Sequence, residues 1–175
     1  YFSTLAANSA VELVARDGVL ALDNGGGAPL TSSFGIPGAG TDVAALTLYP
    51  GSLRATAMSG DLSVGSAMTL APAVGGQLEL FASGAISSAG RINMSALPVS
   101  ALPTAAAPSN EFGDRLAVVT GADYFSRSAY GPESPRAGDT EPVRIIAQGG
   151  DVSGPGGSIF LQLPKRFVLQ AAGDL

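Results

Sequence analysis

The chain has 175 residues, enough for one domain with a buried core, and a single domain is the default expectation. Apolar residues make up 46% of it and aromatic residues only 6%, while 24 Gly and 12 Pro predict little helix, because Gly loses extra backbone entropy and Pro removes a helix donor. The absence of Cys and His excludes thiol chemistry, imidazole catalysis and the usual zinc, copper and haem ligands, and a formal charge of −5 without a basic cluster argues against nucleic acid as a partner.

Two short strands are predicted near the start of the chain. Val11, Leu13 and Ala15 alternate with the residues between them, which places one apolar set on a single strand face. The pair Asp17-Gly18 then supplies a turn, because Gly accepts positive φ and Asp bonds its own backbone. Residues 19–22 are the expected next strand of the same coil.

A loop rich in Gly, Pro, Ser and Thr follows from Asp23 to Gly40, with Phe34 and Ile36 as candidate anchors. A strand pattern resumes at Val43 to Tyr49, and Pro50-Gly51 is a strong turn signal. From Ser52 to Met94 short strands alternate with turns at intervals of about eight to ten residues, which is typical of all-β architecture. The inward-facing candidates in this part are Leu53, Leu62, Val64, Met68, Leu70, Leu78, Leu80, Ile86, Ile92 and Met94.

The stretch from Leu53 to Val64, LRATAMSGDLSV, has four looser copies elsewhere in the chain. In each copy a short apolar alternation is followed by a small residue, a Gly and another apolar residue; the copies are Val11–Leu20, Leu78–Ile86, Val143–Val152 and Phe167–Leu175. The aligned glycines are Gly18, Gly60, Gly84, Gly149 or Gly150, and Gly173. Successive intervals are 42, 24, 65 and 24 residues, so 24 is taken as the unit and 42 and 65 as near two and near three units.

This recurrence predicts a solenoid, because a period of roughly 20 to 30 residues carried by short strands is its sequence signature. Two folds compete: a right-handed parallel β-helix, and a β-sandwich whose hairpins resemble one another. A sandwich has no reason to repeat at this interval. We therefore expect an all-β, right-handed parallel β-helix of about five rungs, spanning on the order of 25 Å.

The part from 97 to 142 differs in kind and is predicted to be an excursion from the coil. It begins with a connector, Ala96–Ser109, whose three prolines remove three ladder donors. A strand at Leu116–Thr120 and a short helix at Asp123–Ser128 are expected within it. Two interpretations stay open: a contact surface, since aromatic and Arg side chains carry much of the energy of interfaces, and a cap packed against the coil. The candidate contact residues are Phe112, Arg115, Tyr124, Phe125, Arg127 and Tyr130.

The repeat resumes at Val143 and continues to the end. Residues Gly154–Gly157 form a long turn, and strands are expected at Ser158–Leu163 and Arg166–Gln170, separated by Pro164-Lys165. Both ends look cut, so the chain is expected to be a fragment of a longer one, with any targeting signal outside it. No stretch approaches the roughly 20 apolar residues that a membrane span needs.

The residues that suggest chemistry have a plainer structural interpretation. Asp61, Asp151 and Asp174 follow the Gly of the repeat and are expected to line up at one corner, where Asp is more often a turn residue than a catalytic acid. The glycine clusters Gly25–Gly27 and Gly38–Gly40 are followed neither by a helix nor by Lys-Ser/Thr, so they are predicted loops. No catalytic residue, metal site or cofactor is predicted.

The segments LRATAMSGDL, LFASGAI and RIIAQGGDV, with FLQLPKRFVLQAAGDL near the end, resemble the filamentous-haemagglutinin-like exoproteins of two-partner secretion systems. The resemblance covers about Val11–Met94 and Val143–Leu175 and does not include the excursion. It implies a right-handed β-helical fibre, export through an outer-membrane transporter, and a secreted or bacterial cell-surface location. A host-cell or neighbouring-cell receptor or glycan is the implied partner.

The sequence thus favours a non-enzymatic stalk segment of such an exoprotein, acting as an adhesin or as the carrier of a contact-dependent toxin. The alternative is a β-helix domain that binds or cleaves polysaccharide. The two differ in carboxylate geometry. An enzyme should bring two or more acids together in one groove, whereas a stalk should leave them singly at turns.

Overall fold

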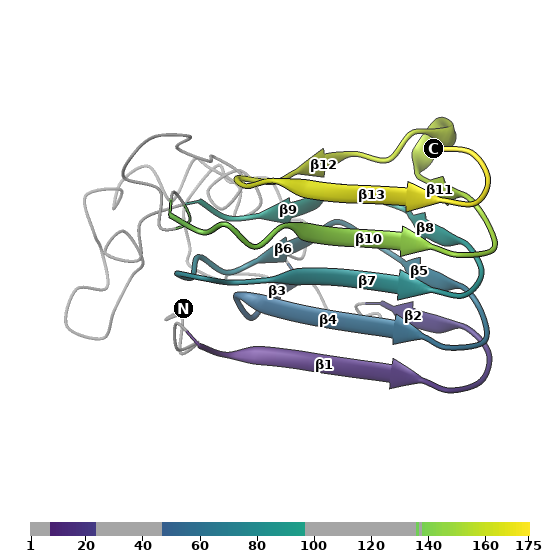
Figure 1. Cartoon of the computed structure of the whole chain (residues 1–175), viewed down its shortest axis with the longest axis horizontal. Coiled ribbons are helices and arrows are strands. Elements are labelled where there is room, and N and C mark those ends of the chain that lie inside the picture. The colour runs from purple at the N-terminus through teal and green to yellow at the C-terminus, as the bar shows by residue number, and fades with distance from the viewer. Residues whose placement is uncertain (1–7, 24–46, 97–135, 137) are drawn as a thin grey trace, which may run out of the picture.

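The computed structural model describes residues 8–23, 47–96, 136 and 138–175 (Figure 1). In these ranges it is an all-β structure of parallel strands, and its helical content is one 3-10 turn, η2 (Pro155–Gly157). The prediction that helix is scarce is confirmed for this part of the chain. The predicted anchors Phe34 and Ile36, strand 116–120 and helix 123–128 lie outside the described residues.

The strands form three parallel sheets, named here sheets A, B and C. Sheet A has the order β1 (Ala10–Ala15), β4 (Ser52–Ala57), β7 (Leu78–Ala82), β10 (Val143–Ala147) and β13 (Phe167–Ala171). Sheet B has the order β11 (Val152–Ser153), β8 (Ile86–Ser88), β5 (Leu62–Val64) and β2 (Leu20–Leu22). Sheet C has the order β12 (Leu161–Gln162), β9 (Ile92–Met94), β6 (Met68–Leu70) and β3 (Thr47–Tyr49).

The chain passes from sheet A to B to C and then starts the next level, so each circuit is one rung of a β-helix-like solenoid. Figure 1 shows sheet A facing the viewer, with β1 at the bottom and β13 at the top. Sheet A has five strands, one per rung, so the rungs are numbered one to five from β1 to β13. This agrees with the expected number of about five. Every pairing between rungs is parallel, so backbone groups of one rung bond to the next.

Like residues stack in files inside the coil. All ten inward candidates predicted between Ser52 and Met94 are at most 1% exposed, which confirms them. At the end of each sheet A strand the register places Ala57, Ala82 and Ala147 on one another, and all three are buried. A small side chain is needed here because the backbone bends into the corner toward sheet B, where a larger one would collide.

The prediction that the long intervals hold two and three units is wrong. Leu20 pairs directly with Leu62, 42 residues on, and Phe81 pairs directly with Ile146, 65 residues on. Each long interval therefore separates strands that are direct neighbours; its additional residues fall between β2 and β3 in the first case and between β9 and β10 in the second. The corner bond from Gly173 N to Gly150 O, 3.2 Å, shows that Gly150 is the aligned glycine of rung four.

Two predicted strands near the end differ in length from those observed. Of Ser158–Leu163 only β12 (Leu161–Gln162) is strand, because its partner β9 begins at Ile92 and offers no ladder before it. The strand expected at Arg166–Gln170 is β13, shifted by one residue to Phe167–Ala171.

Candidate functional site

The predicted contact surface lies outside the described residues, so its interpretation as recognition surface or cap stays a prediction. This applies to all six of its residues: Phe112, Arg115, Tyr124, Phe125, Arg127 and Tyr130. The polar groups that the structure does describe fall into four sets: the corner aspartates, a charge ladder on sheet A, a buried cluster, and a serine-lined groove.

The corner aspartates line up after the glycines of the repeat and bond from rung to rung. Asp61 Oδ1 accepts a hydrogen bond from Ala85 N at 2.8 Å, and Asp151 Oδ1 accepts one from Asp174 N, also at 2.8 Å. In each case the donor occupies the aligned corner position of the following rung. Asp61 and Asp151 therefore satisfy a backbone donor that the turn would otherwise leave to solvent.

The glycine of the next rung makes room for this bond. A Cβ on Gly84 would overlap Asp61 Oδ1, and a Cβ on Gly173 would overlap Asp151 Oδ1. Gly84 does not have a positive φ, so it is close approach rather than backbone conformation that requires glycine here. At each such corner, called here the Gly-Asp corner, the Asp of one rung and the Gly of the next rung thus depend on each other.

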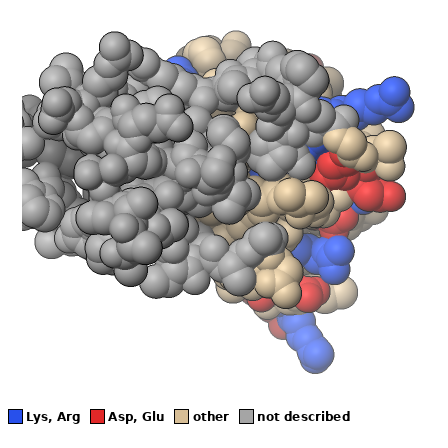
Figure 2. All heavy atoms as spheres, turned by 90° about the vertical axis from the view of Figure 1, so that its left-hand side faces the viewer, with Lys and Arg blue, Asp and Glu red and all other residues tan. Residues whose placement is uncertain are grey.

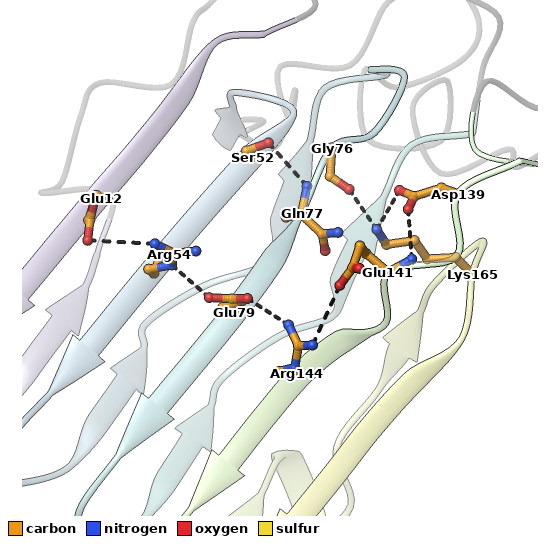
Figure 3. Close-up of polar contacts among 10 residues, drawn as sticks. All are labelled: Glu12, Ser52, Arg54, Gly76, Gln77, Glu79, Asp139, Glu141, Arg144 and Lys165. Carbon is orange, nitrogen blue, oxygen red and sulfur yellow. Dashed lines mark hydrogen bonds and ion pairs between the residues drawn. The ribbon is translucent and has the colours of Figure 1, made fainter.

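The charge ladder consists of Glu12, Arg54, Glu79 and Arg144, which follow one another in register across β1, β4, β7 and β10 (Figure 3). Arg54 Nε lies 2.6 Å from Glu79 Oε2, and Arg144 Nη1 lies 2.9 Å from Glu79 Oε1. Arg54 Nη1 is 3.9 Å from Glu12 Oε1, and Arg144 Nη2 is 3.6 Å from Glu141 Oε2. The hydrogen bond with Glu79, followed by its charge, raises the pKa of Arg54.

Figure 2 shows acidic and basic side chains gathered along the right-hand edge, on the side of sheet A, in alternation. Each ladder arginine is about half exposed, with side-chain exposures of 55% and 41%. Exposed ion pairs of this kind contribute about 0–1 kcal/mol each. The ladder therefore adds little to folding stability and leaves a charged, flat face.

The buried cluster consists of Arg136, Asp139 and Lys165 and lies where the chain returns from sheet C to sheet A. Arg136 Nη1 donates to Gly76 O at 2.6 Å and Nη2 to Ala71 O at 3.2 Å. Arg136 is 1% exposed, and a Cβ on Gly76 would overlap its guanidinium. Arg136 therefore saturates carbonyl groups at the end of one rung and the start of the next.

Lys165 completes the cluster from the turn between β12 and β13. Its Nζ donates to Asp139 Oδ2 at 2.6 Å and to Gly76 O at 3.0 Å, and its side chain is 1% exposed (Figure 3). Asp139 Oδ1 also accepts a hydrogen bond from Glu141 N at 3.0 Å. The cluster ties Arg136 and Asp139 to the turn between β6 and β7 and to the turn between β12 and β13.

Burial and hydrogen bonding shift the pKa values in this cluster. Burial lowers the pKa of Arg136 to about 10, against the opposing charge of Asp139, so the guanidinium stays protonated at neutral pH. Burial by itself would raise the pKa of Asp139, but the hydrogen bonds from Lys165 and from the backbone of Glu141 outweigh it and lower the pKa. Arg136 and Asp139 are therefore both charged at neutral pH, and each is held by hydrogen bonds.

Sequence reasoning missed the buried cluster and the ladder. No spacing links positions 136, 139 and 165, so no sequence signal was available for the cluster. The ladder did have one: Glu12, Arg54, Glu79 and Arg144 each occupy the second position of the apolar alternation in their copy of the repeat.

An open groove on sheet B, with a volume of about 420 Å³, is lined by residues of three successive rungs: Ser63, Ser87, Ser88, Ala89, Ser153, Gly154 and Pro155. Ser63, Ser87 and Ser153 lie on one another in register. The lining includes no carboxylate and no aromatic ring. Within the described ranges, no group of three or more acidic side chains is placed to hold a metal ion.

Comparison with known proteins adds no family assignment: no protein-family model, no curated protein and no solved structure matches the chain. The described part of the chain also holds no helix of sufficient length and apolarity to cross a membrane.

Proposed function

We propose that this chain is a non-catalytic stalk segment of a secreted or cell-surface bacterial exoprotein of the filamentous-haemagglutinin-like type. The observation that carries the proposal is the use made of the corner carboxylates. Asp61 and Asp151 each accept a backbone hydrogen bond from the following rung, so they stand singly at turns instead of converging in a groove. That is the arrangement expected of a stalk.

Two further observations support the stalk. The charges of sheet A pair along the coil axis, and Arg136 with Lys165 joins successive levels at the opposite corner. Each rung is thereby held mainly by its neighbours, so length can be added or removed in units of a rung. The right-handedness of the coil is part of the proposal. It is supported by the rule that about 98% of crossovers between parallel strands of one sheet are right-handed.

The test measures the turnover of polysaccharides by the chain and the length of the coil. On a broad panel of acidic and neutral polysaccharides the chain should produce no new reducing ends. The double substitution Asp61→Asn with Asp151→Asn should lower the denaturation midpoint and have no other effect. Duplication of the 24 residues from Asp61 to Gly84 should give a folded coil about 4.8 Å longer by small-angle X-ray scattering. If the chain depolymerises a polysaccharide and the two substitutions abolish this activity, the chain is a polysaccharide-cleaving enzyme instead.

Polysaccharide binding is the second candidate, favoured by the serine-lined groove. Hydroxyl groups of Ser63, Ser87 and Ser153 recur in three successive rungs, about 4.8 Å apart, and these residues line an open groove. A glycan array tests this candidate directly. A ligand whose binding is lost in Ser87→Val and retained in Ser59→Ala, a substitution at a different corner, would support it.

A further inference from the structure

The charge ladder forms ion pairs between rungs of one chain, and its arginines remain about half exposed on the outward face of sheet A, where they can also contact a second molecule. Along the coil axis the charge ladder alternates in sign, negative, positive, negative, positive, over the first four rungs. Rung five ends the alternation, because Val168 takes the aligned position and is 43% exposed. The face therefore holds an even number of alternating charges.

A second file lies beside the ladder, two residues further along each strand, and is mainly apolar. Val14 is 53% exposed, and the other three members are partly buried. The file consists of Val14, Thr56, Phe81 and Ile146. Sheet A thus presents an apolar file beside the charge ladder, and Figure 2 shows charged side chains exposed along this side of the molecule.

A ladder with an even number of alternating charges is complementary in charge to the same ladder in the opposite order. If a second copy is turned over about an axis parallel to the strands, its ladder faces the first in the opposite order. Glu12 then lies opposite Arg144 of the other copy, and Arg54 lies opposite Glu79. The same rotation places Val14 opposite Ile146, so the apolar files also meet.

We propose that the outward face of sheet A is an interface between two copies of this chain, packed face to face with antiparallel coil axes about a two-fold axis between β4 and β7. Such an interface is isologous, with the same patch used by both partners. This inference concerns lateral association of coils and does not depend on the stalk role.

The charges also select one register. Moving the two-fold axis by half a rung, onto β4, sets Glu12 against Glu79 and Arg54 against Arg54 of the other copy. Placing it on β7 sets Arg54 against Arg144 and Glu79 against Glu79. Both registers oppose like charges, which costs several kcal/mol at a contact. A shift by a whole rung again opposes unlike charges but brings only two of the four ladder positions of each copy into opposed charge pairs, so the central register, which uses all four, is favoured.

The size of the face indicates a weak dimer. Four strands about 4.8 Å apart, each offering about 17 Å of length, give a footprint of roughly 330 Å² per copy. A standard interface buries about 800 Å² per partner, and smaller ones belong to transient complexes. Association is expected at high protein concentration and to weaken with salt, because it depends on exposed charges.

A charge exchange tests the interface, and mixing the two variants separates the contact between copies from the ion pairs that each variant also loses within its own chain. Glu12→Arg opposes two cations in the proposed dimer, and Arg144→Glu opposes two anions, so each variant alone should self-associate at least about tenfold more weakly than the parent chain. An equimolar mixture of the two variants restores opposite charges at both contacts and should regain the parent association. Sedimentation velocity over a concentration series measures all four samples.

The control is Arg166→Glu, which changes a charge in rung five, outside the proposed contact. It should associate as the parent does. A parent chain that stays monomeric at millimolar concentration would overturn the proposal. Association that both variants retain, as end-to-end stacking of coils would give, would also overturn it. So would a mixture that associates no more strongly than either variant alone.

Cross-linking gives an independent readout, because the chain contains no Cys. A short bis-maleimide should join Val14→Cys to Ile146→Cys when the two variants are mixed, and should join neither variant to itself. Self-linking of Val14→Cys would show a parallel or shifted packing and would refute the antiparallel register.

Discussion

The Gly-Asp corner predicts that Gly84→Ala and Asp61→Ala are strongly coupled. A Cβ at position 84 would overlap Asp61 Oδ1 and come within 3.2 Å of the carbonyl of Gly60. The Asp61 side chain must then move, and its 2.8 Å hydrogen bond from Ala85 N is lost. At this exposed corner the lost bond is worth about 1 kcal/mol, and crowding adds about 1–2 kcal/mol. Gly84→Ala should therefore destabilise the chain by about 2–3 kcal/mol.

The double variant separates crowding from the loss of the bond. Asp61→Ala alone should cost about 1 kcal/mol. With Asp61 truncated, the methyl group at position 84 meets only the Gly60 backbone, so most of the crowding is relieved and the hydrogen bond is lost only once. The double variant should therefore cost about 1–2 kcal/mol, less than the sum of the two single changes by about 2 kcal/mol.

Urea denaturation followed by far-UV circular dichroism measures these changes as shifts of the midpoint at unchanged slope. The matched control is Gly138→Ala, because a Cβ there has no heavy atom within 4 Å and the residue lacks a positive φ. It should shift stability by less than about 0.5 kcal/mol. Strict additivity of the two corner substitutions, or a Gly84→Ala effect no larger than that of the control, would refute the reasoning.

Three other predictions concern the corners of the coil. Arg136→Met should cost about 3 kcal/mol in the same urea assay, because the buried carbonyl of Ala71 loses the Arg136 donor and that of Gly76 keeps only Lys165; a loss below about 1 kcal/mol would contradict that role. The lowered pKa of Asp139 means that its stabilisation is complete above its unfolded pKa of about 3.9 and is lost as pH falls through the folded value, so Asp139→Asn should reduce the acid sensitivity of the thermal midpoint. Ala82→Leu should cost at least about 1–3 kcal/mol by overpacking a fully buried alanine file, and a wild-type midpoint would show that the corner has room.

Sequence reasoning succeeded where structure is local. The alternation of apolar residues identified the inward side chains of rungs two and three, and all ten are buried. The Gly-Asp pairs were correctly placed at one corner, since a turn residue acts within a few residues of its own position. Strand ends were less accurate: β12 is shorter than expected because a ladder needs a partner strand, which the sequence of 158–163 does not itself contain.

The polar groups that the structure brings together were missed for a different reason. The six predicted contact residues lie outside the described chain, whereas the groups that the structure brings together were spread over distant positions. Glu12, Arg54, Glu79 and Arg144 become neighbours only once β1, β4, β7 and β10 are stacked in register. Their shared position in the repeat can be read from the sequence, but which of them are neighbours follows only from the order of the strands in sheet A.

The sequence by itself determined that this chain forms short parallel strands in repeating rungs, because side-chain alternation, small corner residues and turn glycines act over a few residues and recur every 24 or so. The tertiary structure alone decided which rungs are neighbours across the intervals of 42 and 65 residues, since extra residues at a corner leave the pairing of the flanking strands unchanged. It also decided that Arg136 and Lys165 share the carbonyl of Gly76, contacts that span 60 and 89 residues. Hydrogen bonds of that range depend on where the finished coil brings the backbone, and no local pattern encodes that position.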